Sequence, residues 1–188
     1  MRWFAAMIAV AVLAAAGVVS AEELKSGPAA GDAIAPFYVV KVAGASDDGV
    51  EVGKELCYRC KYGSRPMVMV FARKPSDGLT ALVKELDEAV AKNSEKQLKA
   101  FVNIVGENKE DAEKAAKDLA KKDSFANVPI VVPEETENGP DNYGLNPKAE
   151  VTVIVAVKGK VTASHGFAAT PDDAQLKEVL EDISKAVQ

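Results

Sequence analysis

Apolar residues along this chain form two kinds of pattern, short continuous runs and stripes with a spacing of three and four. Continuous runs of four to eight apolar residues are typical of strands buried on both faces, whereas the stripes are typical of amphipathic helices. The stripes predict three helices, which begin near residue 77, at residue 109 and near residue 171. The runs predict strands at residues 37–43, 66–73, 98–105, 128–132, 151–157 and 161–167.

Each predicted helix begins with residues that favour a helix N-terminus. Ser76 or Asp77 can cap the first helix, and Asn108 can cap the second. In the third, Thr170 is the expected cap and Pro171 takes the first helical position, followed by two acidic residues that favour the positive end of the helix dipole. Capping chemistry and the apolar stripes therefore predict the same three helix starts.

The order of these elements predicts an α/β fold. One strand is followed by a βαβαβ unit, a β-hairpin and a final helix, which we write β-(βαβαβ)-ββα. Strands that alternate with helices imply parallel pairing with right-handed crossovers. The Lys-Gly-Lys stretch at residues 158–160 favours a tight turn between the last two strands. We therefore expect a central mixed sheet flanked by helices.

The N-terminal residues resemble a secretory signal peptide. Arg2 supplies a positive start, residues 4–19 are almost wholly apolar, and residues 19–21 (Val-Ser-Ala) offer a small-residue cleavage site. The alternative is an uncleaved membrane anchor, but a spanning helix needs about 20 apolar residues and this run is shorter. We predict a signal peptide at residues 1–21, an extended lead-in at 22–36 and one domain at 37–188, in a secreted or periplasmic protein.

Charge and length narrow the class of protein. The 188 residues include 23 Lys and Arg against 28 Asp and Glu, for a net charge of −5. Removing residues 1–21 leaves 167 residues, long enough for one domain with a core, and a net charge of −6 (22 basic against 28 acidic). The basic residues form no block interleaved with aromatic ones, so we expect no nucleic-acid partner. We expect no membrane span after cleavage and no cofactor; the partner would be a protein or a protein disulfide.

Three stretches resemble the thioredoxin-like superfamily, in its exported peroxiredoxin-like and thiol-reductase-like branches. GDAIAPF (residues 31–37) is similar to the lead-in of those proteins, and PMVMVFAR (66–73) to the central strand that ends at their active site. Residues 128–161 are similar to the later half, in which a strand, a loop ending in Tyr-Gly and a hairpin follow in order. The resemblance implies a thioredoxin-like fold over roughly residues 30–188.

The chain departs from that superfamily where its chemistry lies. The C-x-x-C motif would follow the central strand, but this chain has Lys-Pro-Ser-Asp-Gly at residues 74–78, and the head of the next helix (77–82) has no peroxidatic cysteine. Peroxidase activity is therefore not expected. Val151 occupies the position of the superfamily's cis-proline. A cis bond before valine costs about 3 kcal/mol or more, so we expect a trans peptide between Glu150 and Val151.

The only two cysteines, Cys57 and Cys60, come before the central strand and not after it. A strand rises about 3.3 Å per residue, so an eight-residue strand separates its ends by roughly 26 Å. We therefore expect the pair at the opposite end of the strand from the usual site. In an oxidising compartment the two cysteines are expected to bond to each other.

Two interpretations of this pair stay open. As a local clip, a bond that closes so short a loop stabilises the fold by roughly 2 kcal/mol. As a redox site, the pair would benefit from cationic neighbours that favour the thiolate, although no helix start is predicted at the pair. In that case Cys57 would be the more exposed, attacking thiol and Cys60 the resolving one. The neighbours are Lys54, Arg59, Lys61 and Arg65, against Glu51 and Glu55.

The sequence thus predicts a non-catalytic or degenerate thioredoxin-like domain with a Cys57–Cys60 disulfide. The alternative hypothesis is a thiol–disulfide oxidoreductase that uses the same two cysteines.

Other candidate sites are weaker. A single C-x-x-C supplies two of the four ligands that zinc requires, and the only histidine, His165, is distant in sequence. A c-type haem would need histidine where Lys61 stands. Ser164 and His165 are neighbours on a strand and point to opposite faces, so they form no dyad. The acidic loop residues Glu134, Glu135, Glu137 and Asp141 lack the spacing of a calcium loop, and we predict no metal site.

Overall fold

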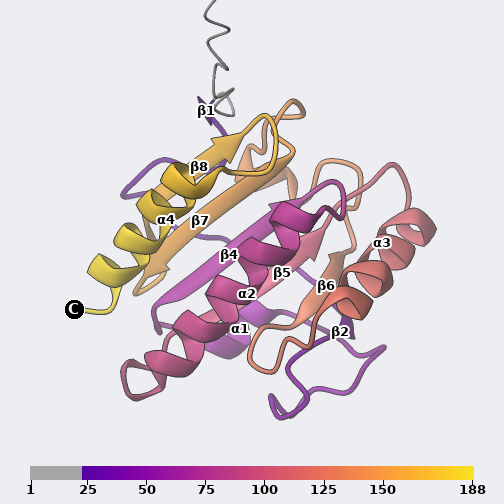
Figure 1. Cartoon of the computed structure of the whole chain (residues 1–188), viewed down its shortest axis with the longest axis horizontal. Helices are drawn as coiled ribbons and strands as arrows, with labels where there is room; N and C mark the ends of the chain where they lie inside the picture. The colour runs from indigo at the N-terminus through magenta and orange to yellow at the C-terminus, as the bar shows by residue number, and fades with distance from the viewer. Residues whose placement is uncertain (1–22) are drawn as a thin grey trace, which may run out of the picture.

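The computed structural model describes residues 23–188, and the predicted signal peptide lies outside the described residues. Eight strands form one mixed sheet in the order β1-β8-β7-β4-β5-β6-β2-β3 (Figure 1). β4, β5 and β6 pair in parallel, and the other neighbours pair antiparallel. The strands are β1 (Glu23–Leu24), β2 (Val39–Ala43), β3 (Glu55–Leu56), β4 (Met67–Ala72), β5 (Lys99–Ile104), β6 (Ile130–Pro133), β7 (Val151–Val157) and β8 (Lys160–Phe167).

The predicted order of strands and helices is confirmed, and so is the mixed sheet. The three long helices, α2 (Asp77–Lys92), α3 (Lys109–Lys122) and α4 (Asp173–Ala186), lie on one face of the sheet (Figure 1). Their apolar stripes share one core with alternate residues of the strands, as the periodicity requires. No helix within residues 23–188 has both the length and the apolar content to cross a membrane.

Two of the three predicted caps are confirmed. The Ser76 hydroxyl accepts from the backbone N–H of Leu79 (3.0 Å), and the Asn108 side chain accepts from that of Asp111 (2.9 Å). The prediction for α4 was wrong, because Asp172 caps this helix in a capping box with Gln175. α4 begins at Asp173, so Thr170 lies two residues before the cap position, and its hydroxyl lies 2.8 Å from that of Ser76.

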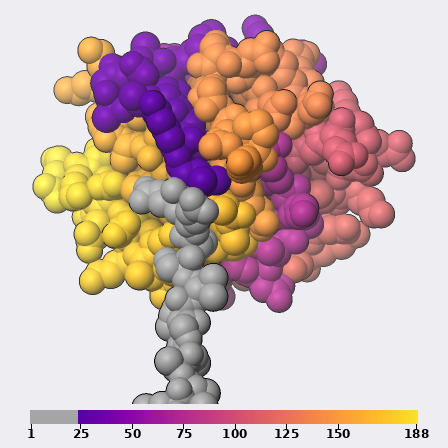
Figure 2. Space-filling view, turned by 90° about the horizontal axis from the view of Figure 1, so that it is seen from above, coloured from indigo at the N-terminus to yellow at the C-terminus, as the bar shows by residue number. Residues whose placement is uncertain are grey.

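The opposite face of the sheet is covered by a five-residue helix, α1 (Tyr58–Tyr62), and by irregular segments. Figure 2 shows the segment that follows residue 23 lying against the loop near residue 140. Hydrogen bonds join the two segments, from the Tyr143 hydroxyl to the Ala35 carbonyl (2.8 Å) and from the Gly27 N–H to the Gly144 carbonyl (3.3 Å). The aromatic residues buried on this face are Tyr58, Tyr62, Phe71, Phe101 and Tyr143, with Phe37 packed against them.

The segment predicted as a lead-in also protects an edge of the sheet. β1 pairs with the end of β8, and further along the Gly31 N–H and the Ile34 N–H donate to the carbonyls of Val161 (2.8 Å) and Gly159 (3.0 Å). An uncovered edge strand would present free N–H and C=O groups to other chains. Residues 23–34 therefore cover the outer edge of β8.

Candidate functional site

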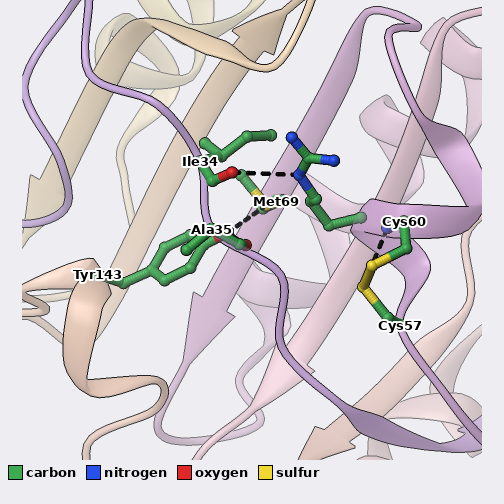
Figure 3. The surroundings of a disulfide bond; sticks show 7 residues. Ile34, Ala35, Cys57, Cys60, Met69 and Tyr143 are labelled. Atoms are coloured by element: carbon green, nitrogen blue, oxygen red, sulfur yellow. Dashed lines mark hydrogen bonds between the residues drawn. A yellow bond between two sulfur atoms is a disulfide. The ribbon is translucent and has the colours of Figure 1, made fainter.

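The disulfide joins Cys57 and Cys60 across the first turn of α1 (Figure 3). Cys57 is the N-cap residue, and its sulfur accepts the backbone N–H of Cys60 at 3.0 Å. The Cα atoms of the two cysteines are 5.2 Å apart. We expected no helix start at this pair, and that expectation was wrong. A helix of five residues is too short to show an apolar stripe, so periodicity could not reveal it.

The exposure of the two sulfur residues is the reverse of what we expected. Cys57 is only 8% exposed, whereas Cys60 is exposed. The reason is helical geometry. Tyr58 and Tyr62 are four residues apart and both face the core, so Cys60, halfway between them, lies on the solvent side of α1. If thiol chemistry occurs here, the accessible sulfur is that of Cys60.

Aromatic packing fixes α1 to the sheet. The Tyr58 and Tyr62 rings lie 5.7 and 6.0 Å from that of Phe101 on β5. The Tyr58 hydroxyl donates to the Asp48 carboxylate at 2.5 Å, and the Tyr62 hydroxyl donates to the Ala100 carbonyl at 3.4 Å. Burial, reinforced by the hydrogen bond to Asp48, raises the pKa of Tyr58 far above its usual range, and burial raises that of Tyr62 as well. Both side chains are therefore neutral anchors.

A buried ion pair extends this anchor to the loop between β2 and β3. Lys41 is 1% exposed, and its ammonium group donates to the Asp48 carboxylate (2.7 Å) and to the carbonyls of Ala45 and Val50 (2.8 Å each). Three acceptors satisfy all three N–H donors of the lysine, which is the condition for burying such a charge. Asp48 thus joins Lys41 of the sheet to Tyr58 of α1.

The predicted cationic neighbours surround the disulfide but form no ion pair among the described residues. The Arg59 guanidinium donates to the Ile34 carbonyl (3.2 Å), on the segment drawn beside the disulfide in Figure 3. That of Arg65 donates to the side-chain oxygen of Gln97 (3.1 Å) and to the Lys61 carbonyl (3.2 Å). Because these acceptors are neutral, they do not compensate the charges of Arg59 and Arg65.

The two ends of β4 carry different features, and we name each end after its feature. The disulfide pole is the N-terminal end with α1, and the motif pole is the C-terminal end with residues 73–78. Met67 at the first end pairs with Ala156, and Ala72 at the other pairs with Val151. A six-residue strand separates the two poles by roughly 20 Å, and α1 packs on Phe101 in the N-terminal half of β5, so the disulfide lies on the side away from residues 73–78.

At the motif pole, hydrogen bonds join the side chains of Ser76 and Arg73 to neighbouring segments. The hydroxyls of Ser76 and Thr170 lie 2.8 Å apart, and Gly78 approaches so closely that a Cβ on it would be 2.5 Å from the Thr170 methyl group. The Arg73 guanidinium donates to the carbonyls of Ala149 (3.1 Å) and Glu137 (3.0 Å), and burial lowers the pKa of Arg73. Within residues 23–188, neither cysteine lies at this pole, because Cys57 caps α1 and Cys60 lies within it.

The peptide before Val151, at the position of the superfamily's cis-proline, has the predicted trans geometry. Residues 23–188 contain no cis peptide bond, so the peptide between Glu150 and Val151 is trans. The Glu150 carbonyl accepts the Arg73 N–H at 3.0 Å, and the Glu150 N–H donates to Phe167 at 2.8 Å. Backbone pairing therefore occupies a position that the superfamily uses beside its reaction centre.

The remaining candidate residues lie apart from the disulfide. The His165 imidazole lies 3.0 Å from the Asp182 carboxylate of α4, while the Ser164 hydroxyl donates to the Pro28 carbonyl (2.7 Å), so the two point to opposite faces as predicted. In the acidic loop the Glu135 carboxylate accepts the Asp141 N–H (2.7 Å). Across residues 23–188, no three Cys, His, Asp or Glu side chains converge as metal ligands; this holds for the loop residues Glu134 and Glu137 too.

Solved structures with the same fold are known, although no protein-family model and no curated protein matches this chain. A protein assigned as the thiol:disulfide interchange protein DsbE from Chlorobium tepidum aligns with a TM-score of 0.62 at 15% identity, over 85% of this chain and 99% of that chain. The exposed lipoprotein thioredoxin Etrx1 from Streptococcus pneumoniae aligns with a TM-score of 0.53 at 17% identity, over 80% and 99%. A PrxQ variant from Xylella fastidiosa aligns with 0.53 at 9% identity, over 85% and 98%.

At these identities the similarity concerns the fold and not the chemistry. Both kinds of protein named by the predicted resemblance, thiol:disulfide proteins and peroxiredoxins, are among the structural neighbours. The chain therefore has a thioredoxin-like fold, with a C-x-x-C disulfide at the opposite end of the central strand from its motif pole.

Proposed function

We propose that this protein is an exported thioredoxin-fold scaffold that binds another protein and carries out no chemistry at its motif pole. The observation that supports this most directly is the motif pole itself. Among residues 23–188 it has no cysteine, and the Ser76–Thr170 contact and the Arg73 hydrogen bonds occupy the place of a reaction centre. In this proposal the Cys57–Cys60 disulfide is a local clip that holds the first turn of α1.

Export rests on the N-terminal pattern and on the disulfide. Residues 1–21 read as a signal peptide, and disulfides persist in oxidising compartments. One structural neighbour is an exposed lipoprotein, which is in keeping with this location. We infer a secreted or periplasmic protein. Sequencing the N-terminus of the protein recovered from outside the cytoplasm would test this, with Glu22 expected as the first residue.

The clip interpretation is tested by redox behaviour. A structural disulfide resists the glutathione pool, with a potential below about −300 mV, whereas exchange enzymes lie between about −270 and −120 mV. We expect the Cys57–Cys60 couple in the first range and no turnover in a disulfide-reductase assay. A potential in the enzyme range, with turnover that Cys57→Ser abolishes, would contradict the scaffold proposal.

A second candidate function is thiol–disulfide exchange at the disulfide pole, which the exposure of Cys60 favours. A partner thiolate would attack the Cys60 sulfur and form a mixed disulfide. The S–S bond breaks, and its electron pair goes to the Cys57 sulfur, which accepts the Cys60 N–H as an N-cap. A second partner thiolate then attacks the partner sulfur and releases Cys60. Two partner thiols are oxidised to a disulfide, and their protons pass to the two cysteines.

This second function makes its own prediction about which sulfur is attacked. Oxidised protein would be treated with glutathione, quenched with acid, alkylated and mapped by mass spectrometry. If exchange occurs, the glutathione adduct is expected on Cys60, because Cys57 is buried. An adduct mainly on Cys57 would contradict this mechanism, and no adduct at all would favour the clip.

A further inference from the structure

We propose that a groove beside α1 is a docking surface for an acidic segment of a partner protein. This inference rests on the scaffold function proposed above and names the chemical class of its partner. The groove has a volume of about 490 Å³ and lies at the disulfide pole. Lys61 and Arg65 line it from α1 and the turn that follows, and Lys99 lines it from the start of β5. We call these three residues the basic rim.

The charges of the basic rim are unpaired, unlike most of those on the long helices. None of the three rim residues has a carboxylate within 4 Å in the described part of the chain. On α2, α3 and α4, by contrast, most lysines are neutralised locally. The helical ion pairs are Lys84–Asp123, Lys92–Glu88, Lys117–Glu113, Lys121–Asp118, Lys122–Asp77, Lys177–Glu181 and Lys185–Asp182.

The rim is also partly preorganised. The Arg65 guanidinium is held by the Gln97 side chain (3.1 Å) and by the carbonyls of Lys61 (3.2 Å) and Tyr62 (3.5 Å). These neutral acceptors position the group without cancelling its charge. A preorganised guanidinium loses less conformational entropy when it binds a carboxylate, so more of the interaction energy contributes to affinity.

The two acidic residues that line the groove, Asp47 and Asp48, do not cancel the positive charge of the basic rim. The Asp48 carboxylate is bonded to the Lys41 ammonium (2.7 Å) and to the Tyr58 hydroxyl (2.5 Å), so its charge is already compensated. Among residues 23–188, Asp47 is the only other acidic residue that lines the groove. Three positive charges against one leave the groove basic, in a chain whose net charge is −5. An acidic segment is therefore attracted to this groove, although the chain as a whole carries a net negative charge.

A polypeptide fits the groove better than a nucleic acid. Binding of single strands combines a long basic track with aromatic side chains on which bases stack. In the described part of the chain, Tyr62 is the only aromatic residue that lines this groove and it is buried, and three lining residues carry a positive charge. The polar side chains of Ser94, Gln97 and Asn127 supply hydrogen-bonding groups suited to a peptide backbone.

The test measures binding of a fluorescein-labelled peptide of ten glutamates to the full protein by fluorescence anisotropy. Reversing two rim charges, Lys61→Glu with Lys99→Glu, should weaken binding at least tenfold. The matched control, Lys92→Glu with Lys177→Glu, changes the net charge equally but lies on α2 and α4, and should weaken binding less than twofold. Since Lys99 is half-buried, Lys61→Gln with Lys99→Gln provides a milder second variant, expected to weaken binding three- to fivefold.

Three results would overturn the proposal: no measurable binding to the wild type, equal weakening in both charge-reversed proteins, or tighter binding of a ten-nucleotide oligo(dT) than of the peptide. The disulfide-reductase assay on the same proteins separates this inference from the scaffold function. All the variants keep both cysteines, so turnover would contradict the scaffold whatever the peptide does. Absence of turnover together with absence of peptide binding would contradict the docking surface alone.

Discussion

The two ends of β4 are held in different ways. At the disulfide pole, a short helix is anchored by two buried tyrosines, a buried ion pair and a disulfide. At the motif pole, the ends of several elements are joined by hydroxyl and guanidinium hydrogen bonds around Ser76 and Arg73. In this fold, therefore, a C-x-x-C motif is informative only together with the strand end at which it stands.

The largest expected effect concerns the anchor at the disulfide pole. Tyr58→Ala removes a fully buried ring and leaves Asp48 with one partner fewer, so the free energy of unfolding should fall by about 3–5 kcal/mol. Tyr58→Phe keeps the ring and removes only the hydroxyl, which should cost about 1–2 kcal/mol. Urea denaturation of the two variants measures both values. Similar losses in the two would show that the Asp48 hydrogen bond, and not the ring, holds α1.

The second largest expected effect on stability concerns Gly78, which lies close to Thr170 at the motif pole. Alanine favours a helix over glycine by less than about 1 kcal/mol, but the Cβ of Gly78→Ala would lie 2.5 Å from the Thr170 methyl group. We expect a net loss of about 1–2 kcal/mol in the free energy of unfolding, because Thr170 must turn away from Ser76.

Thr170→Ser supplies the matched background, since it removes the methyl group and keeps the hydroxyl. In that background Gly78→Ala should cost almost nothing, as measured by thermal or urea unfolding. An equal cost in both backgrounds would show that the backbone of Gly78, and not this contact, limits substitution.

A smaller effect is expected from the disulfide. Cys57→Ser combined with Cys60→Ser opens a loop of very few residues, so the free energy of unfolding should fall by roughly 2 kcal/mol or less. The tyrosine anchors should keep α1 in place, and the Tyr58 environment measured by near-UV circular dichroism should change little. Global unfolding of the double variant would show that the disulfide supports the whole disulfide pole and not only the first turn of α1.

The smallest expected effect on stability concerns Asp182, which lies away from both poles. Although burial alone would raise the pKa of Asp182, hydrogen bonds from Lys185 and His165 outweigh it and lower that pKa in the folded state. The stabilisation from this carboxylate is therefore present above pH 4 or so and is lost as the pH falls through its folded pKa.

Asp182→Asn tests this sign. The variant should be less stable than the wild type by under about 1 kcal/mol at pH 6, and the difference should vanish near pH 2–3. Unfolding curves across that range, with the exposed Glu178→Gln as a surface control, measure it. A difference that grows as the pH falls would contradict the assignment.

Local chemistry made much of this fold predictable. Ser76 and Asn108 cap their helices as expected because an N-cap depends on a few adjacent residues. The buried strands were visible because their apolar runs are continuous. Thr170 is not the cap of α4 because the helix begins at Asp173, and the Asp-x-x-Gln pattern of residues 172–175 was a local signal of the capping box that the structure contains.

The candidate site was predictable only in part. The position of the cysteines before β4 followed from their order in the chain. The short helix α1 that carries them could not be predicted from that order, because one turn of helix has no recognisable period. The exposure of Cys60 depends on which side of that turn faces the sheet. The Lys41–Asp48–Tyr58 network joins three segments and was likewise invisible, although a lysine inside an otherwise apolar strand was a usable signal.

The sheet face that carries α1 closes late in the synthesis of the chain. That face is sealed where the Tyr143 hydroxyl meets the Ala35 carbonyl, a contact between residues 108 apart. During synthesis from the N-terminus, Phe37 can pack against Phe71 and Phe101 once these residues emerge, whereas Tyr143 follows much later. The contact that joins the N-terminal segment to the loop of Tyr143 therefore forms only after most of the chain has been made.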